Sequence, residues 1–248
     1  MIPFFRKIRR KMADDNKPMQ YMRYAIGEIL LVVIGILIAL SINNWNQDRI
    51  ERKIEKRLLV ELFENLEFNE KNLESDIAEE YKSINSIKHV LTILNNRLPY
   101  HDSMDYHFGR AQYSPDIILS ATAFHSIQSK GFDIITSDSL RNAIITLFDN
   151  DYGFLISQTV RLEDQFWPSS LLPIYHKHFR INDMEGSPYN DRLNSKPVDY
   201  DALLNDSEYH NIIKHRGGFR YQGAALKKDA LKKTIALKQQ IRSNLNNE

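Results

Sequence analysis

The stretch from Tyr24 to Trp45 constrains the fold of this chain more than any other part of the sequence. Its centre, Ile29 to Leu40, is apolar throughout except for Gly35. With its neighbours this run reaches about 18 mostly apolar residues, and a helix over 24–45 is about 33 Å long, enough for a hydrocarbon layer of about 30 Å. Tyr24 and Trp45 are aromatic anchors at the two ends. We therefore expect a transmembrane helix over residues 24–45.

The charge distribution predicts how this helix is oriented. Residues 1–23 hold seven Lys or Arg residues and two Asp residues, a net charge of +5 in a chain whose total is +1. Positively charged flanks stay on the cytoplasmic side. Residues 1–23 are therefore expected to form a cytoplasmic tail, and residues 46–248 a domain on the other side of the membrane. Within the tail, residues 2–12 have the spacing of an interfacial helix that would contact anionic membrane lipid.

A cleaved signal peptide is the alternative interpretation of the same stretch. Ala39-Leu40-Ser41 resembles a cleavage site between small residues, and the apolar run is short. However, the positively charged region before the apolar run would be about 24 residues long, which is long for a signal peptide, and the helical pattern continues past the site. These two features favour a retained anchor.

Three residues of the predicted span are candidates for a contact between membrane helices. Gly35 and Ala39 form a small-xxx-small pair, and Glu28 lies seven residues before Gly35 on nearly the same face. A charged residue inside a membrane is usually functional. Because Glu28 is only about one turn from Tyr24, its carboxylate can instead reach the cytoplasmic interface.

Beyond the membrane the pattern is helical, and the predicted fold class is all-α. No Pro or Gly occurs between Ile36 and Leu98, where apolar residues recur every three or four positions. The span is therefore expected to continue into a long helix, either straight or bent near residues 68–72 where the apolar stripe changes phase. Asn95, Asn96 and Pro99 are expected to end it. The rest of 46–248 is expected to pack against it as a helical bundle.

Shorter helices are predicted from capping signals. Ser114-Pro115-Asp116 predicts a helix that Gly131 ends, and Thr136-Ser137-Asp138 predicts a second one. A third is expected to end or kink at Pro168. We interpret residues 99–114 and 180–200 as loops because they are rich in polar and turn-forming residues.

The C-terminal region is expected to hold two further helices. Asn205 with Glu208 resembles a capping box, and Gly217-Gly218 is expected to interrupt the helix that follows. A last helix begins at about Tyr221 and runs to the end. Its apolar stripe should be buried: Ala230, Thr234, Leu237, Ile241 and Leu245. Its lysines should lie in solvent: Lys227, Lys228, Lys232, Lys233 and Lys238.

Two groups of residues are candidate metal ligands. His101, Asp102, Asp105 and His107 are residue types that bind zinc, but their spacing matches no ligand signature. His176 and His178 are two positions apart and would point away from each other on a helix. Local hydrogen bonding is the expected role of both groups, and we predict no metal and no cofactor.

The N-terminal text closely resembles a bacterial family of single-span membrane proteins that is catalogued as a domain of unknown function. The resemblance rests on FFRKIR at Phe4–Arg9, AIGEI at Ala25–Ile29, VVIGILIAL at Val32–Leu40 and INNWN at Ile42–Asn46. A weaker similarity covers Ser126–Ile144. The resemblance implies a single-pass protein of the inner membrane with a periplasmic C-terminal domain. It brings no catalytic residues, and it favours a role for Glu28.

No nucleotide-binding loop, nucleophile elbow or zinc-protease motif occurs in the sequence. The chain has no Cys, and its net charge of +1 gives no indication of a nucleic-acid partner. The leading hypothesis is a non-enzymatic interaction or scaffold protein of the cell envelope, with membrane lipid and a protein partner or a second copy as its contacts. The alternative is an extracytoplasmic ligand-sensing helical domain that signals through a separate membrane partner. A hydrolase using residues 101–107 ranks third.

The small-residue pair in the span leads to a direct prediction. Gly35→Leu should abolish cross-linking between spans, because a large side chain keeps two helix backbones apart. Cross-linking between engineered cysteines in the membrane would measure it, and an unchanged cross-link would exclude a contact through Gly35.

Overall fold

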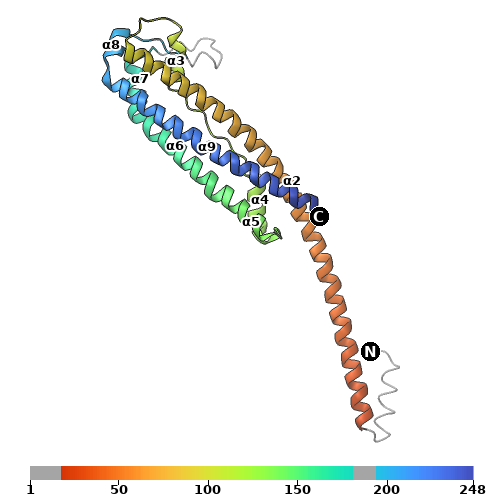
Figure 1. Cartoon of the computed structure of the whole chain (residues 1–248). Coiled ribbons are helices and arrows are strands. Elements are labelled where there is room, and N and C mark those ends of the chain that lie inside the picture. Colours follow the sequence, from red (N-terminus) through yellow and green to blue (C-terminus); the bar gives the residue numbers. More distant parts are fainter. Residues whose placement is uncertain (1–17, 181–193, 248) are drawn as a thin grey trace. The chain divides into compact units, whose positions relative to one another are not determined.

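The computed structural model describes residues 18–180 and 194–247, and it forms two compact units, Met1–Glu55 and Lys56–Glu248. The regular structure of the described residues is helical, apart from one antiparallel bridge between Phe179 and Pro197. The predicted all-α class is therefore confirmed for these residues (Figure 1). The predicted interfacial helix over residues 2–12 lies outside them.

Helix α2 (Pro18–Asn96) belongs to both units. Its length confirms the prediction of an uninterrupted helix through the Pro- and Gly-free stretch. It ends where the polar residues and Pro99 predicted, and Arg97, just beyond it, adopts a left-handed conformation with a φ of 48°. In the first unit, the apolar side chains of α2 from Ile26 to Ile42 are exposed.

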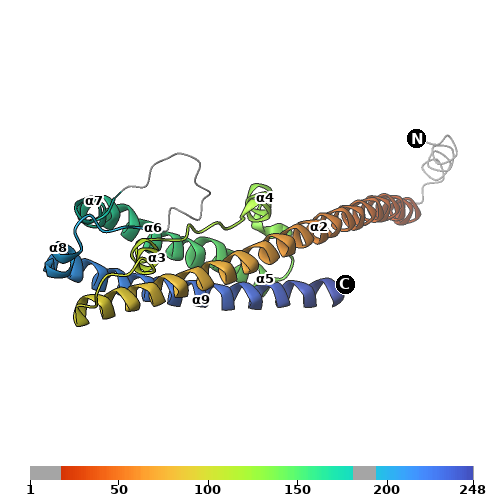
Figure 2. The ribbon, with the colours of Figure 1, turned by 90° about the horizontal axis from the view of Figure 1, so that it is seen from above.

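In the second unit, α2 pairs with α9 (Ser207–Asn247) in antiparallel orientation (Figures 1 and 2). Residues further along α2 contact, overall, residues nearer the start of α9. The pairs, in the order of α2, are Phe63 with Arg242, Glu70 with Lys238, Glu80 with Lys227, Tyr81 with Lys228, Ile87 with Gly217 and Lys88 with Tyr221. The apolar stripe predicted for the last helix is buried as far as Ile241.

The predicted interruption at Gly217-Gly218 is wrong, because α9 passes through both glycines. Gly217 is instead a point of close approach between helices. A Cβ atom on Gly217 would lie 3.2 Å from Cγ2 of Ile87, whereas one on Gly218 would meet nothing within 4 Å. The missing side chain at Gly217 therefore lets α9 lie against α2.

Helix α9 also begins at a different cap from the predicted one. Asn205 is the last residue of α8 (Tyr200–Asn205), a helix that the sequence did not predict. The side chain of Asp206 accepts hydrogen bonds from the backbone amides of Glu208 and Tyr209 at 2.8 and 3.0 Å. Asp206 therefore satisfies the first amides of α9, as an N-cap residue does.

The predicted helix start at Ser114-Pro115-Asp116 is wrong. Residues 113–121 have no regular secondary structure, and α4 (Thr122–Lys130) begins only after them. We call these residues the extended segment, because they run along the bundle without forming a helix. Side chains of α2 hold this segment: Asn69 bonds both the amide and the carbonyl of Ser120, and Asn72 donates to the carbonyl of Ile118. Because these asparagines satisfy its backbone, the segment has no need to form a helix. Figure 2 shows it running along the bundle between α3 (Met104–Arg110) and α4.

From Ser137 onward the chain is helical up to His178. The predicted start is confirmed, since Ser137 caps α5 (Asp138–Ile145) by accepting from the amide of Leu140. Two π-helical segments lie within the run, and Pro168 does not end it. The elements after η1 (Phe132–Ile134) and α5 are η2 (Thr146–Tyr152), α6 (Gly153–Phe166), η3 (Trp167–Leu171) and α7 (Leu172–His178).

The bundle is filled by apolar side chains at both ends. At the end formed by α3, α7 and α8, one cluster includes Ile87, Phe108, Ile174 and Leu203. Towards the other end, Phe124 and Phe148 stack with ring centroids 4.8 Å apart. Charged side chains are buried between these two apolar regions, and they define the candidate site.

The two neighbouring glycines of α9 provide a matched test of the close approach. Gly217→Leu should lower the free energy of unfolding by about 1–3 kcal/mol, because the new side chain has no room beside Ile87. Gly218→Leu should leave it unchanged or raise it by up to about 1 kcal/mol, since Leu favours helix over Gly. Urea unfolding followed by circular dichroism measures both, and equal effects would contradict the close approach.

Candidate functional site

The residues that the sequence proposed for a membrane contact all lie on α2 within the first unit. Glu28 is partly buried, and Ala39 is exposed. A Cβ atom on Gly35 would meet nothing within 4 Å, so the chain leaves space there for another helix. A contact through Glu28, Gly35 and Ala39 stays a prediction.

The histidines and aspartates of residues 101–107 do not converge. His101 shares a hydrogen bond with Ser103, Asp105 accepts one from Tyr100 at 2.8 Å, and His107 lies 3.2 Å from the hydroxyl of Ser86. The prediction that residues 99–114 form a loop is wrong for part of this range, because α3 covers Met104–Arg110. Over residues 18–180 and 194–247, no three His, Asp or Glu side chains are grouped as metal ligands would be.

The pair His176 and His178 also separates. His178 is buried and its Nε2 lies 2.7 Å from the carboxylate of Asp206, the cap of α9, while His176 is exposed. Lys177 bonds the same carboxylate. Burial alone would raise the pKa of Asp206, but these partners and the amides of α9 hold it well below its ordinary value. Lys177 and His178 therefore fasten α7 to the start of α9 through Asp206.

The strongest concentration of buried charge lies where α2, α6 and α9 meet. Glu80 of α2 accepts hydrogen bonds from Lys227 at 3.0 Å and from Arg220 at 3.3 Å, and all three side chains are at most 5% exposed. Arg220 also binds Glu163 of α6 and donates to the hydroxyl of Ser114. One network thus joins three helices and the extended segment.

Arg216 completes this network on the side of α6. Its side chain is fully buried, and it donates to Glu163 at 2.8 and 2.9 Å and to the backbone carbonyl of Gln112 at 2.6 Å. Burial lowers the pKa of Arg216 to about 10, and Glu80 partly offsets this effect, so the guanidinium is charged at neutral pH. We call Glu80, Glu163, Arg216, Arg220 and Lys227 the buried charge network.

The sequence did not predict the buried charge network, and Lys227 was wrongly placed in solvent. A signal was present in the spacing of three and four residues that continues into Ala230 and the buried stripe of α9. The residues in this spacing are Ile213, Arg216, Arg220, Ala224 and Lys227. Charged residues in phase with an apolar stripe indicate buried ion pairs. The other four lysines mostly follow the prediction: Lys228, Lys232 and Lys233 are exposed, and Lys238 is partly buried. Three of them have partners, since Lys228, Lys233 and Lys238 contact Tyr81, Asp151 and Glu70.

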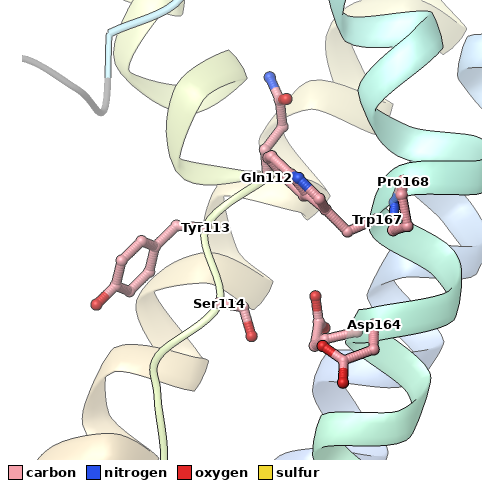
Figure 3. A pocket seen from close by; sticks show the side chains of 7 residues that line it. Gln112, Tyr113, Ser114, Asp164, Trp167 and Pro168 are labelled. Atoms are coloured by element: carbon pink, nitrogen blue, oxygen red, sulfur yellow. The ribbon is translucent and has the colours of Figure 1, made fainter.

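An open pocket of about 510 Å³ lies against this network, between the extended segment and α6. Its lining residues are Gln112, Tyr113, Ser114, Glu163, Asp164, Trp167 and Pro168. In Figure 3, Ser114 and Asp164 lie on opposite sides of the space, Trp167 reaches from the helix towards Gln112, and the ring of Tyr113 points away. The volume is in the range of small-molecule sites.

The charged side chains that line this pocket are both acidic. Glu163 and Asp164 lie in its wall, whereas Arg216 and Arg220 lie behind it and are at most 5% exposed. Trp167 and Pro168 belong to the π-helical segment η3, and such segments often occur at functional sites. The pocket therefore combines an aromatic surface with hydrogen-bond acceptors.

Comparisons with known proteins found no match to a protein-family model, to a curated protein or to a solved structure. The family resemblance of the N-terminal residues therefore remains a prediction. No catalytic residue is assigned to this chain.

Removal of one member of the buried charge network should unfold the domain more easily. Arg216→Ala should cost about 3–5 kcal/mol in the free energy of unfolding, because Glu163 would keep only Arg220 as a partner, the carbonyl of Gln112 would lose its donor and a fully buried side chain would leave a cavity. Lys233→Ala is the control, and its largely exposed ion pair should contribute less than about 1 kcal/mol. Urea unfolding measures both variants, and an Arg216→Ala effect as small as the control would show that the network does not hold the bundle together.

Proposed function

We propose that this chain is a single-pass inner-membrane protein whose helical domain is periplasmic and serves as a non-enzymatic interaction or scaffold module of the cell envelope. The observation that carries this proposal is the apolar part of α2. Within the described residues, α2 is the one helix that is long and apolar enough to cross a membrane, and none of its apolar window is buried.

The energetics of this segment support a bilayer as its environment. Leaving a large aliphatic side chain in water instead of burying it costs about 1.5–3 kcal/mol. The exposed side chains between Ile26 and Ile42 include Ile29, Leu30, Leu31, Val32, Ile34, Ile36, Leu37, Ile38 and Leu40. A bilayer covers all of them at once. The basic residues before the segment support a cytoplasmic N-terminus.

An interaction role is supported by the surface of α6 and the start of η3. Ile156, Val160 and Trp167 have the spacing of one helix face, and each is more than a third exposed. Exposed aliphatic and aromatic side chains that share a face are typical of contact surfaces. We propose that the partner is a protein of the envelope or a second copy of this chain.

The natural absence of cysteine makes the proposed topology directly testable. Single cysteines at Met19 and at Ser139, both exposed, can be labelled in intact spheroplasts with a maleimide that does not cross membranes. We expect labelling of Met19→Cys only after lysis and of Ser139→Cys without it, with the full-length chain in the membrane fraction. A soluble product that begins near Ile42, or the reverse labelling, would contradict the proposal.

A second candidate function is ligand sensing, and the pocket beside the buried charge network favours it. Helical bundles can hold small molecules between their helices. The pocket touches both α6 and the extended segment, and Glu163 in its wall is bound to Arg216 and Arg220 of α9. A ligand at this wall would therefore act on the same side chains that hold the bundle together. We propose that the signal passes through a separate membrane partner.

A further inference from the structure

The hydrogen-bonding groups of the pocket determine what kind of molecule it suits. Its two ionised side chains, Glu163 and Asp164, only accept hydrogen bonds. Glu163 is fixed by Arg216 and Arg220, so its position is set before any ligand enters. Asp164 is exposed, and no described residue forms an ion pair with it. A ligand must therefore bring donors to this wall.

The apolar part of the wall adds a second requirement. Trp167 is 37% exposed and lies three residues after Asp164, so one helix face presents a carboxylate and an indole together. A cation is attracted both to a carboxylate and to the face of an indole ring. Pro168 extends the apolar surface next to Trp167. Figure 3 shows Asp164 of α6 and Trp167 and Pro168 of η3 across the space from Gln112 and Ser114.

The positive charges nearby do not oppose this pairing. Arg216 and Arg220 point their donors at Glu163, Glu80, Ser114 and the carbonyl of Gln112. Most of their donors are thus engaged inside the bundle, although the three cations and two carboxylates of the buried charge network sum to +1. Among residues 18–180 and 194–247, none forms an ion pair with Asp164, so its carboxylate is available at the pocket wall.

We propose that this pocket binds a small organic cation, an amine with an apolar body, whose ammonium group lies between Asp164 and the indole of Trp167. The apolar body then packs on Trp167 and Pro168. This inference rests on the ligand-sensing candidate function and names its ligand class. It is independent of the membrane anchor.

Binding can be measured with three probes that share one apolar body: 2-phenylethylamine, 2-phenylethanol and phenylacetate. Trp45 and Trp167 are the two tryptophans, so in full-length Trp45→Phe protein in nonionic detergent the fluorescence reports on Trp167 alone. We expect a saturable change with the amine, and affinities at least about tenfold weaker for the alcohol and the carboxylate. Asp164→Asn should weaken binding of the amine about tenfold.

Asp149→Asn is the matched control, because Asp149 is also an exposed acid of the same helical run but does not line the pocket. It should leave the affinity unchanged. Equal affinities for the three probes, preference for phenylacetate, or equal effects of the two Asp variants would overturn the ligand class and leave the sensing function open. If no probe bound saturably, the ligand class and the sensing function would both fail, and the anchor would be unaffected.

Discussion

The domain depends on opposite charges that meet where water is excluded. Glu80, Arg220 and Lys227 are almost completely buried, and Glu163 connects them to Arg216. Desolvation of such groups is expensive, and only a complete set of partners offsets it. Each glutamate of the network binds two cations. Loss of Glu80 therefore leaves Lys227 without its carboxylate partner, and loss of Glu163 does the same to Arg216. Loss of one cation leaves a glutamate with one partner instead of two. An apolar core alone would not impose this penalty.

This requirement has a consequence for the alignment of the helices. Two apolar stripes can slide past each other at small cost, since one aliphatic contact replaces another. A slide of α9 by one turn along α2 would separate Lys227 from Glu80 and move Gly217 away from Ile87. The charges and the close approach thus select the same register. Arg216 and Arg220 of α9 also hold Glu163 in place, so the position of this pocket residue depends on how α9 packs in the bundle.

Local signals predicted local structure well. The Pro- and Gly-free stretch, the cap at Ser137 and the apolar stripe of α9 were all found as expected. The failures lie where a distant side chain overrides a local signal. Ser114 has the chemistry of a cap, but Arg220 occupies its oxygen, and α4 instead receives its cap from Asn65 of α2. Gly217 has the chemistry of a breaker, but the packing of α9 on α2 uses its small size.

Little of the candidate site was predictable, for the same reason. Glu163 and Asp164 are ordinary residues of a helix until α9 and the extended segment are placed beside them. The membrane topology stays a prediction. It rests on the apolar stretch and the charges before it, which need no tertiary contact to be recognised.

The claim that buried charges hold the bundle in register is tested most directly by a double-mutant cycle on Glu80 and Lys227. The free energies of unfolding of Glu80→Gln, Lys227→Met and the double variant would be compared with the parent chain. The double variant should lose less than the sum of the two single losses, by at least about 1 kcal/mol, because Glu80→Gln leaves Lys227 without its carboxylate partner and Lys227→Met leaves Glu80 with Arg220 alone. Additive losses would contradict it.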